Sequence, residues 1–130
     1  MEAIISNCLF CTIDSARIIA ENDLAYSVYD GYPVTELHTL VIPKRHAATY
    51  FDLSSQERDD CYQLLDQSKK SIELKDASVT GFNIGMNNGE SAGQTIFHCH
   101  IHLIPRRDGD ADSPQGGVRG VIPSKQGYYK

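Results

Sequence analysis

Three histidines occupy alternate positions within residues 94–106, at His98, His100 and His102. Because side chains alternate between the two faces of a β-strand, a strand here would place the three imidazoles on one face, roughly 6.5–7 Å apart. Cys99 would then lie on the opposite face. Histidine titrates near neutral pH and can act as a nucleophile, a general acid or base, or a metal ligand. The spacing therefore predicts a surface that performs one of these kinds of chemistry.

Two kinds of chemistry and one structural role are open for these histidines. One imidazole could attack phosphorus and form a covalent nucleotidyl-histidine, while its neighbours orient it and assist the leaving group. Alternatively, His98, His100 and His102 could hold a catalytic metal ion with an open coordination position. In the structural role, the histidines would be packed and hydrogen-bonded and would perform no chemistry. Their strict alternation after a polar loop disfavours this role.

A second set of potential metal ligands begins with the C-x-x-C pair Cys8 and Cys11. Such a pair can be half of a zinc site, a redox pair or two small buried residues. The strand–helix pattern expected around a thioredoxin-like redox pair is absent from the surrounding sequence. Two further nitrogen ligands would complete a closed tetrahedral site of the kind that is structural, and His46 and His98 are candidates.

Around these residues, alternation and turn signals predict several strands and one helix. Ser54 and Glu57 form a capping box at the start of an amphipathic segment, which predicts a helix that covers a sheet. We expect the charged residues of this helix, Glu57 among them, to face solvent. The predicted strands are residues 18–20, 25–29, 37–43 (a central strand), 79–87 and a histidine strand ending at Pro105, and the predicted helix is residues 52–76 with Cys61, Leu64, Leu65, Ser68 and Ile72 on its buried stripe.

Residues 87–93 and the stretch after Pro105 contain groups that could bind anions. The loop at 87–93 is rich in small residues and amides, and such loops present backbone N–H groups to anions. Arg106 and Arg107 could hold phosphate, or they could be a solvated pair balanced by nearby aspartates. Gly, Pro, Asp and Ser dominate from there on, so we expect an irregular tail with at most one short strand near residues 118–122.

Composition limits the classes of function. A net charge of −5 over 130 residues disfavours a binder of duplex nucleic acid, which usually has a basic surface. The sequence contains no run of about 18 apolar residues, so we expect no membrane span. The first residues include Glu2 and no basic segment, so we expect no signal peptide. Four cysteines in that context indicate a reduced, cytoplasmic setting.

The segment QTIFHCHIH resembles the signature of the histidine triad family, a glutamine and a hydroxyl residue followed by three alternating histidines. The segments CLFC, LHTLVIPKRH and MNNGESAG also resemble that family, in the same order, so the resemblance covers roughly residues 7–108. The tail is closer to bacterial and fragile-histidine-triad members than to the Hint branch. The resemblance implies a single α+β domain over residues 1–130, with an antiparallel sheet of about five strands, one long helix, a largely irregular tail at 107–130, and a homodimer whose sheet continues across the interface.

The resemblance also implies roles for individual residues. His100 matches the nucleophile, His102 the residue that contacts the phosphate and assists the leaving group, and His38 the distant member of the catalytic network. Zinc-bearing members use residues that match Cys8, Cys11, His46 and His98 for a structural Zn²⁺, with no organic cofactor. Asp30 matches a residue that binds ribose hydroxyls; Asn87, Gln94 and Thr95 match phosphate contacts; and Arg106 and Arg107 could meet a second nucleotide or outer phosphates.

The implied activity is hydrolysis or transfer at the α-phosphate of a purine nucleotide. The substrates would be dinucleoside polyphosphates or nucleoside phosphoramidates. Two alternatives remain: a nucleotide-binding regulatory or interaction protein whose hydrolysis is incidental, and a metal-dependent hydrolase that uses the histidine cluster. The sequence leaves the leaving group and the base preference open.

Overall fold

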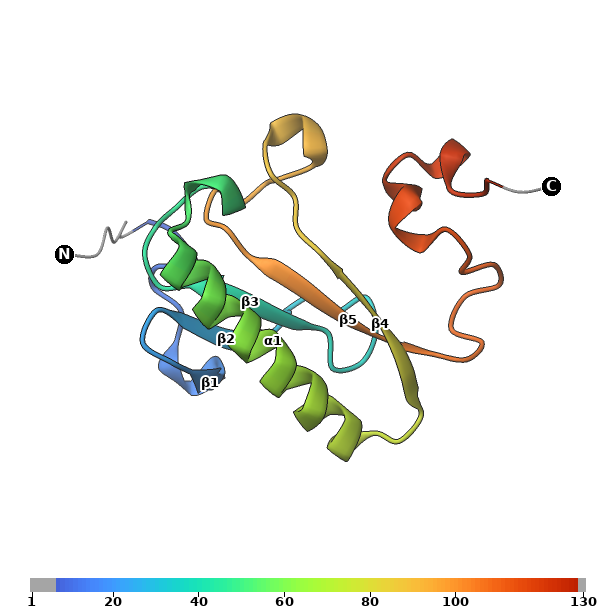
Figure 1. The fold of residues 1–130 in the computed structure, drawn as a ribbon, viewed down its shortest axis with the longest axis horizontal. Coiled ribbons are helices and arrows are strands. Elements are labelled where there is room, and N and C mark those ends of the chain that lie inside the picture. The colour runs from blue at the N-terminus through green and yellow to red at the C-terminus, as the bar shows by residue number, and fades with distance from the viewer. Residues whose placement is uncertain (1–6, 129–130) are drawn as a thin grey trace.

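The structure, a computed structural model, describes residues 7–128 and contains a five-stranded antiparallel sheet with one long helix against it (Figure 1). This arrangement confirms the predicted α+β fold. Residues 1–6, where no signal peptide is expected, lie outside the described part of the chain. The strands stand in the order β1-β2-β3-β5-β4, with bounds β1 Ile18–Glu21, β2 Ala25–Tyr29, β3 Thr39–Pro43, β4 Val79–Gly85 and β5 Ile101–Arg107, and the helix is α1 Ser55–Lys75.

The strand predicted at residues 37–43 is central, as expected. β3 lies between β2 and β5, and each of its residues is buried. Val41 packs on the side that α1 covers, whereas Leu40 and Ile42 pack on the opposite face with Phe10. Burial on both faces explains why this strand is apolar from Leu40 to Pro43 rather than alternating.

The capping box predicted from Ser54 and Glu57 is present at the start of α1, but the helix begins later than the predicted residue 52. The Ser54 side chain accepts a hydrogen bond from the Glu57 N–H, and the Glu57 carboxylate accepts one from the Ser54 N–H. The preceding residues form a separate 3₁₀ turn, Tyr50–Asp52, with its own capping box, so the helix begins three residues later than predicted. The expectation that Glu57 faces solvent is wrong: it is 5% exposed, and both of its carboxylate oxygens bind Arg45 at 2.9 Å.

The histidine strand differs from its prediction at both ends. β5 begins at Ile101, so His98 and His100 precede the strand, with His98 in a bend over residues 96–98. Pro105 does not end the strand, because it pairs with Phe82 of β4. The Pro105 carbonyl accepts a hydrogen bond from Thr35 on the other side, beyond the end of β3. Since the N and C=O of a strand residue point to the same side, the missing N–H removes no bond to β4.

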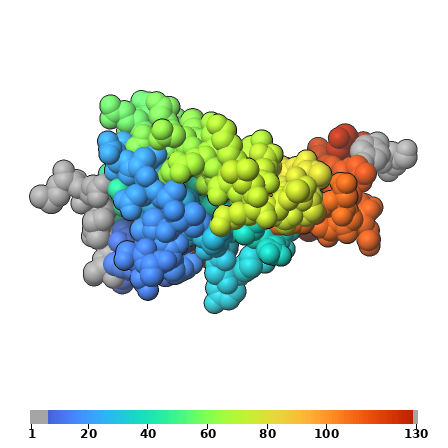
Figure 2. All heavy atoms as spheres, turned by 90° about the horizontal axis from the view of Figure 1, so that it is seen from below, coloured from blue at the N-terminus to red at the C-terminus, as the bar shows by residue number. Residues whose placement is uncertain are grey.

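The tail forms no strand near residues 118–122, where at most one short strand was expected. Two 3₁₀ helices, Gly117–Val121 and Pro123–Lys125, occupy this stretch. A space-filling view shows the tail as a projection at one end of the molecule, beyond the layer of α1 (Figure 2). Among the described helices, none has the length and apolar character needed to cross a membrane.

Candidate functional site

The ring of His100 is oriented by one backbone hydrogen bond. Its Nδ1–H donates to the carbonyl of His98 at 2.8 Å, and the Phe10 ring lies against it with centroids 5.0 Å apart. The proton is therefore on Nδ1, and the lone pair of Nε2 is available. His100 lines a cavity of about 510 Å³, so this arrangement could present a nucleophilic nitrogen to a bound molecule.

His38 and His102 form a hydrogen-bonded pair beside that nucleophile. The Val34 N–H donates to His38 Nδ1 at 3.0 Å, which leaves the proton of His38 on Nε2. That Nε2–H donates to His102 Nδ1 at 2.9 Å, and the proton of His102 is then on its own Nε2. The sequence of bonds fixes both tautomers and makes His102 a hydrogen-bond donor next to His100, whose ring centroid is 5.3 Å away.

Burial keeps this histidine pair neutral. Desolvation, followed by the nearby His100 and His38, lowers the pKa of His102 to about 4. Desolvation also lowers the pKa of His38, although Asp30 opposes this shift. The Asp30 carboxylate lies 3.5 Å from His38 Nε2 and 3.9 Å from His102 Nδ1, while its other oxygen accepts the Tyr32 N–H at 2.8 Å.

The predicted alternation of faces is confirmed, although the three histidines have different partners. Phe10 contacts the rings of both His98 and His100, whereas Cys99, Ile101 and Leu103 pack into the core on the other side. Within residues 7–128, His98 and His102 belong to two separate groups of potential metal ligands, and His100 belongs to neither. The geometry therefore does not support one catalytic metal held by all three.

The cavity contains most of the residues that the sequence assigned to substrate. Asp30, His38, Asn87 and Thr95 line it together with His100 and His102. Phe10 and Arg17 are among the lining residues that sequence reasoning missed. Phe10 stands between the two cysteines of the C-x-x-C, so a metal site shared with His98 would have placed it beside the histidines. No signal in the sequence singled out Arg17.

Gln94 lies outside the cavity lining. It is 3% exposed, and its amide nitrogen donates to the carbonyls of Ala48 and Ile96 at 2.6 and 3.1 Å. Its amide oxygen accepts the Gly89 N–H at 2.8 Å. Gln94 thus joins three loops around the site, and its side chain is engaged within the protein rather than directed at a ligand.

Both arginines that could hold phosphate are engaged by carboxylates. Arg106 binds Asp110 through two hydrogen bonds of 2.9 and 2.7 Å and donates to the Asn83 side chain at 2.7 Å. Arg107 binds Asp76 at 2.9 and 3.1 Å. Arg106 lines a second cavity beside the first, whereas Arg107 lines neither.

The four predicted metal ligands converge on one point. The Nδ1 atom of His98 lies 3.4 Å from the Cys8 sulfur and 3.5 Å from the Cys11 sulfur, and His46 Nδ1 lies 3.2 Å from the Cys11 sulfur. Ligand atoms around a tetrahedral zinc ion are separated by roughly 3.5 Å, given the usual Zn–S and Zn–N lengths. His98 Nε2–H donates to the Pro43 carbonyl at 2.7 Å, which directs the Nδ1 lone pair to the sulfurs in the manner of an outer-shell partner.

Three comparisons with known proteins agree with this geometry. The model of the HIT domain family matches residues 13–109. The adenosine 5′-monophosphoramidase HNT1 of Candida albicans is 32% identical over 110 residues, which cover 79% of this chain and 72% of that protein. A HIT family protein from Bacillus anthracis superposes with a TM-score of 0.74 at 36% identity, covering 81% of this chain and 77% of that one. A Zn-bound histidine triad family protein from Mycobacterium smegmatis has a TM-score of 0.74 at 33% identity, covering 82% and 80%.

Proposed function

Since this chain belongs to the HIT (histidine triad) family, we propose that it is a nucleotide hydrolase that acts at the α-phosphate through a nucleotidyl-histidine intermediate on His100. The observation that supports this best is the bond from His100 Nδ1–H to the His98 carbonyl. In the neutral ring, this bond puts the proton on Nδ1 and the lone pair on Nε2, and His100 lines the cavity where an attacking nitrogen must meet its substrate.

The reaction proceeds in two displacements at phosphorus. First, the Nε2 lone pair of His100 forms a bond to the α-phosphorus, and the bond from phosphorus to the leaving group breaks. His102 is neutral in the free protein; the negative charge of a bound phosphate would favour uptake of one proton from solvent by this ring, and the leaving atom takes one proton from His102 Nε2 as its bond to phosphorus breaks. In the second displacement, water attacks the phosphorus and its proton passes through His102 back to solvent. The N–P bond breaks, the nucleoside monophosphate leaves and His100 is free again.

The remaining cavity residues bind the nucleotide. Asp30 lies at the end of the cavity nearest His38 and would accept ribose hydroxyls. Thr95 and Asn87 line the wall near the histidines and would contact phosphate oxygens. Gln94 would act indirectly by holding the loop that contains Thr95. The purine would lie against the apolar lining residues Leu9, Phe10, Leu40 and Ile96.

Nucleoside phosphoramidates and dinucleoside polyphosphates are the proposed substrate classes. The relative HNT1 of Candida albicans is by name an adenosine 5′-monophosphoramidase, which favours the phosphoramidates here. The proposed homodimer and cytoplasmic location go with this function, and both stay predictions.

We further propose that Cys8, Cys11, His46 and His98 hold a structural Zn²⁺. The donor set and its spacing fit this ion, which would tie the N-terminal segment to the turn that contains His46. Removing the metal with a chelator should lower the melting temperature by several degrees before it lowers activity per folded molecule. Metal analysis of the purified protein should give one zinc per chain. Equal stability before and after complete removal would contradict a structural role.

The central experiment compares the wild type with His100→Ala on adenosine 5′-phosphoramidate and on diadenosine tetraphosphate. The wild type should release AMP, and the variant should lose at least about 1,000-fold in kcat because the nucleophile is gone. When a substrate labelled at the α-phosphate is used and the reaction is stopped rapidly without acid, the label should be found bound to the wild-type protein and not to His100→Ala. Unchanged turnover in the variant would remove His100 as the nucleophile. A folded wild type that binds nucleotide without turnover would instead support the nucleotide-binding regulatory alternative.

A further inference from the structure

Arg17 lines the cavity that contains His100, and the proposed function gives it no role. Among the described residues of this lining, it is the one lysine or arginine, and Asp30 is the one carboxylate. Arg17 ends the short 3₁₀ turn Ser15–Arg17, directly before β1. A guanidinium only donates hydrogen bonds, so at this place it determines which polar atoms of a bound molecule can be accommodated.

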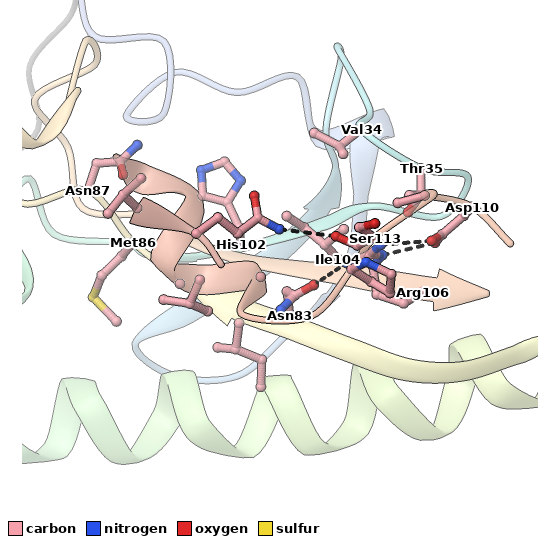
Figure 3. A pocket seen from close by; sticks show the side chains of 18 residues that line it. Val34, Thr35, Asn83, Met86, Asn87, His102, Ile104, Arg106, Asp110 and Ser113 are labelled. Atoms are coloured by element: carbon pink, nitrogen blue, oxygen red, sulfur yellow. Dashed lines mark hydrogen bonds and ion pairs between the residues drawn. The ribbon is translucent and has the colours of Figure 1, made fainter. Parts of the chain in front are cut away.

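The guanidinium of Arg17 is held by the backbone and not by a carboxylate. Its Nη2–H donates to the carbonyl of Tyr29 at 3.2 Å, which is the one hydrogen bond of this side chain within the described part of the protein. Arg106 shows the opposite case in the second cavity, where both oxygens of Asp110 and the side chain of Asn83 accept its N–H groups (Figure 3). An arginine has five N–H groups, so the remaining ones of Arg17 can donate to a ligand.

Arg17 lies beside the residue proposed to bind the ribose. The carbonyl that holds it belongs to Tyr29, directly before Asp30 in the chain. Directly after Asp30, a Cβ atom added at Gly31 would lie 3.8 Å from Arg17 Nη2. Arg17 does not line the second cavity, which His102 shares with the first. The guanidinium is therefore close to the nucleoside part of the proposed substrate.

The wall next to Arg17 is where the base is expected. Burial raises the pKa of the Tyr26 phenol, and the charge of Arg17 is close enough to oppose this shift. The Tyr26 O–H donates to the carbonyl of Phe10 at 2.5 Å, and Phe10 is one of the apolar lining residues against which the purine would lie. A base packed on this wall thus has a neighbour that can only donate hydrogen bonds.

The two purines differ in what they offer to such a donor. Guanine presents two acceptors side by side, O6 and N7, which match the paired N–H groups of an arginine, whereas adenine presents N7 next to the amino group N6, which is itself a donor. We propose that Arg17 selects the base by donating to O6 and N7, and that guanine nucleotides are the preferred substrates. This inference rests on the proposed function and specifies the base of its substrate.

The first test compares the 5′-phosphoramidates of adenosine, guanosine and inosine, which differ only in the base. Inosine has the O6 and N7 of guanosine but not its 2-amino group, so it isolates the contact with Arg17. The wild type should have a kcat/KM about tenfold higher for guanosine and inosine than for adenosine, in the lower part of the range for a paired arginine contact because Arg17 is exposed. The dissociation constants of GMP and AMP, measured by calorimetry, should differ by the same ratio.

Two substitutions test the paired donors of Arg17. Arg17→Ala should make the kcat/KM values for guanosine and adenosine substrates nearly equal. Arg17→Lys should recover little of the preference, because an ammonium keeps the charge but has no planar pair of donors. The matched control is Arg119→Ala, since Arg119 is also exposed and also donates to a backbone carbonyl, that of Gln126, but lines neither cavity. This control should keep the wild-type preference, and thermal unfolding checks that each variant is folded.

The outcomes separate this inference from the proposed function. If the folded wild type hydrolysed none of the three phosphoramidates, the proposed function would be overturned, and the binding of GMP and AMP would still test the base preference. If it hydrolysed all three equally well, the role of Arg17 alone would be wrong. Full preference for guanosine in either Arg17 variant, or an equal loss of preference in Arg119→Ala, would also overturn that role.

Discussion

One backbone carbonyl, that of His98, determines which nitrogen of His100 can react. A second backbone group, the Val34 N–H, determines the tautomers of His38 and His102 in the same way. In the proposed mechanism, three chemically identical side chains thereby act as a nucleophile, a donor and a positioning residue. Their different roles would follow from the groups that their Nδ1 atoms meet, which are the His98 carbonyl, the His38 ring and the Val34 N–H. Sequence spacing alone does not specify those groups.

His38 can be tested as a positioning residue for His102. His38→Ala removes the Nε2–H that donates to His102 Nδ1, so His102 can turn and change tautomer. We expect kcat to fall about 10- to 100-fold, the equivalent of one or two lost hydrogen bonds in the transition state. His38→Gln has an N–H at a similar reach and should recover part of the loss. If His38→Gln were no better than His38→Ala in kcat, the donor role would be wrong.

The lowered pKa of His102 predicts how stability depends on pH. In the unfolded chain this ring binds a proton below about 6.5, whereas in the folded protein it stays neutral until about pH 4. Its contribution is thus fully present above pH 6.5 and is lost as the pH falls toward 4. Urea unfolding from pH 7.5 to 4.5 should show a slope that is smaller in His102→Gln than in the wild type by up to about 1.4 kcal/mol per pH unit. Parallel curves would contradict this prediction.

Residue types and spacings predicted which side chains gather, but not what each one binds. The metal ligands and the residues around His100 come together as the sequence indicated. Gln94 and Arg106 were expected to contact phosphate, yet each side chain is held by a local partner and by a distant one. The distant partners, Ala48 and Asn83, are 46 and 23 residues away in the chain. Pairing over such distances depends on tertiary structure, which a local pattern does not contain.

At the scale of elements, the periodicity of the sequence predicted which helices and strands occur better than it predicted where each one begins and ends. The predicted helix and the five predicted strands all occur. The end of β5 was predicted wrongly at Pro105, because the position of its missing N–H faces away from β4 and the strand continues past it. The tail, where at most one short strand was expected, forms none in residues 118–122. Apolar residues such as Val118 and Val121 resemble a strand in sequence, but no neighbouring strand edge pairs with them, and Gly116 begins a 3₁₀ turn there with φ 78°.

The start of α1 offers a prediction at this scale. Glu57 completes the capping box and binds Arg45, the residue before the zinc ligand candidate His46. Glu57→Gln should lower the free energy of unfolding by about 2 kcal/mol, less than the largest losses for buried pairs because Arg45 is partly exposed. Urea titration measures this. The control Glu73→Gln breaks the exposed pair with Lys69 and should cost no more than about 0.5 kcal/mol. Equal losses in both variants would contradict the buried role of Glu57.

At the scale of the whole molecule, the two edges of the sheet differ. β1 is four residues long, contains a bulge and has Glu21 paired with Lys44, which are features that protect an edge from association. β4 is the other edge and reads VTGFNIG, with neither a charged residue nor a proline. An unprotected edge of seven residues favours pairing with a second strand, and this agrees with the expected homodimer whose sheet continues across the interface.

Thr80 allows that interface to be tested without breaking the sheet. The register of β4 against β5 skips Thr80, which lies between paired Val79 and Gly81, so a proline at this bulge should leave the β4–β5 ladder intact. We expect light scattering to give twice the chain mass for the wild type at micromolar concentration, and a shift toward the single-chain mass for Thr80→Pro. Thr80→Val keeps the N–H and the β-branched shape, and should stay dimeric. If folded Thr80→Pro stayed dimeric, the interface would lie away from β4. If the wild type were monomeric, the β4 edge would be unpaired in solution.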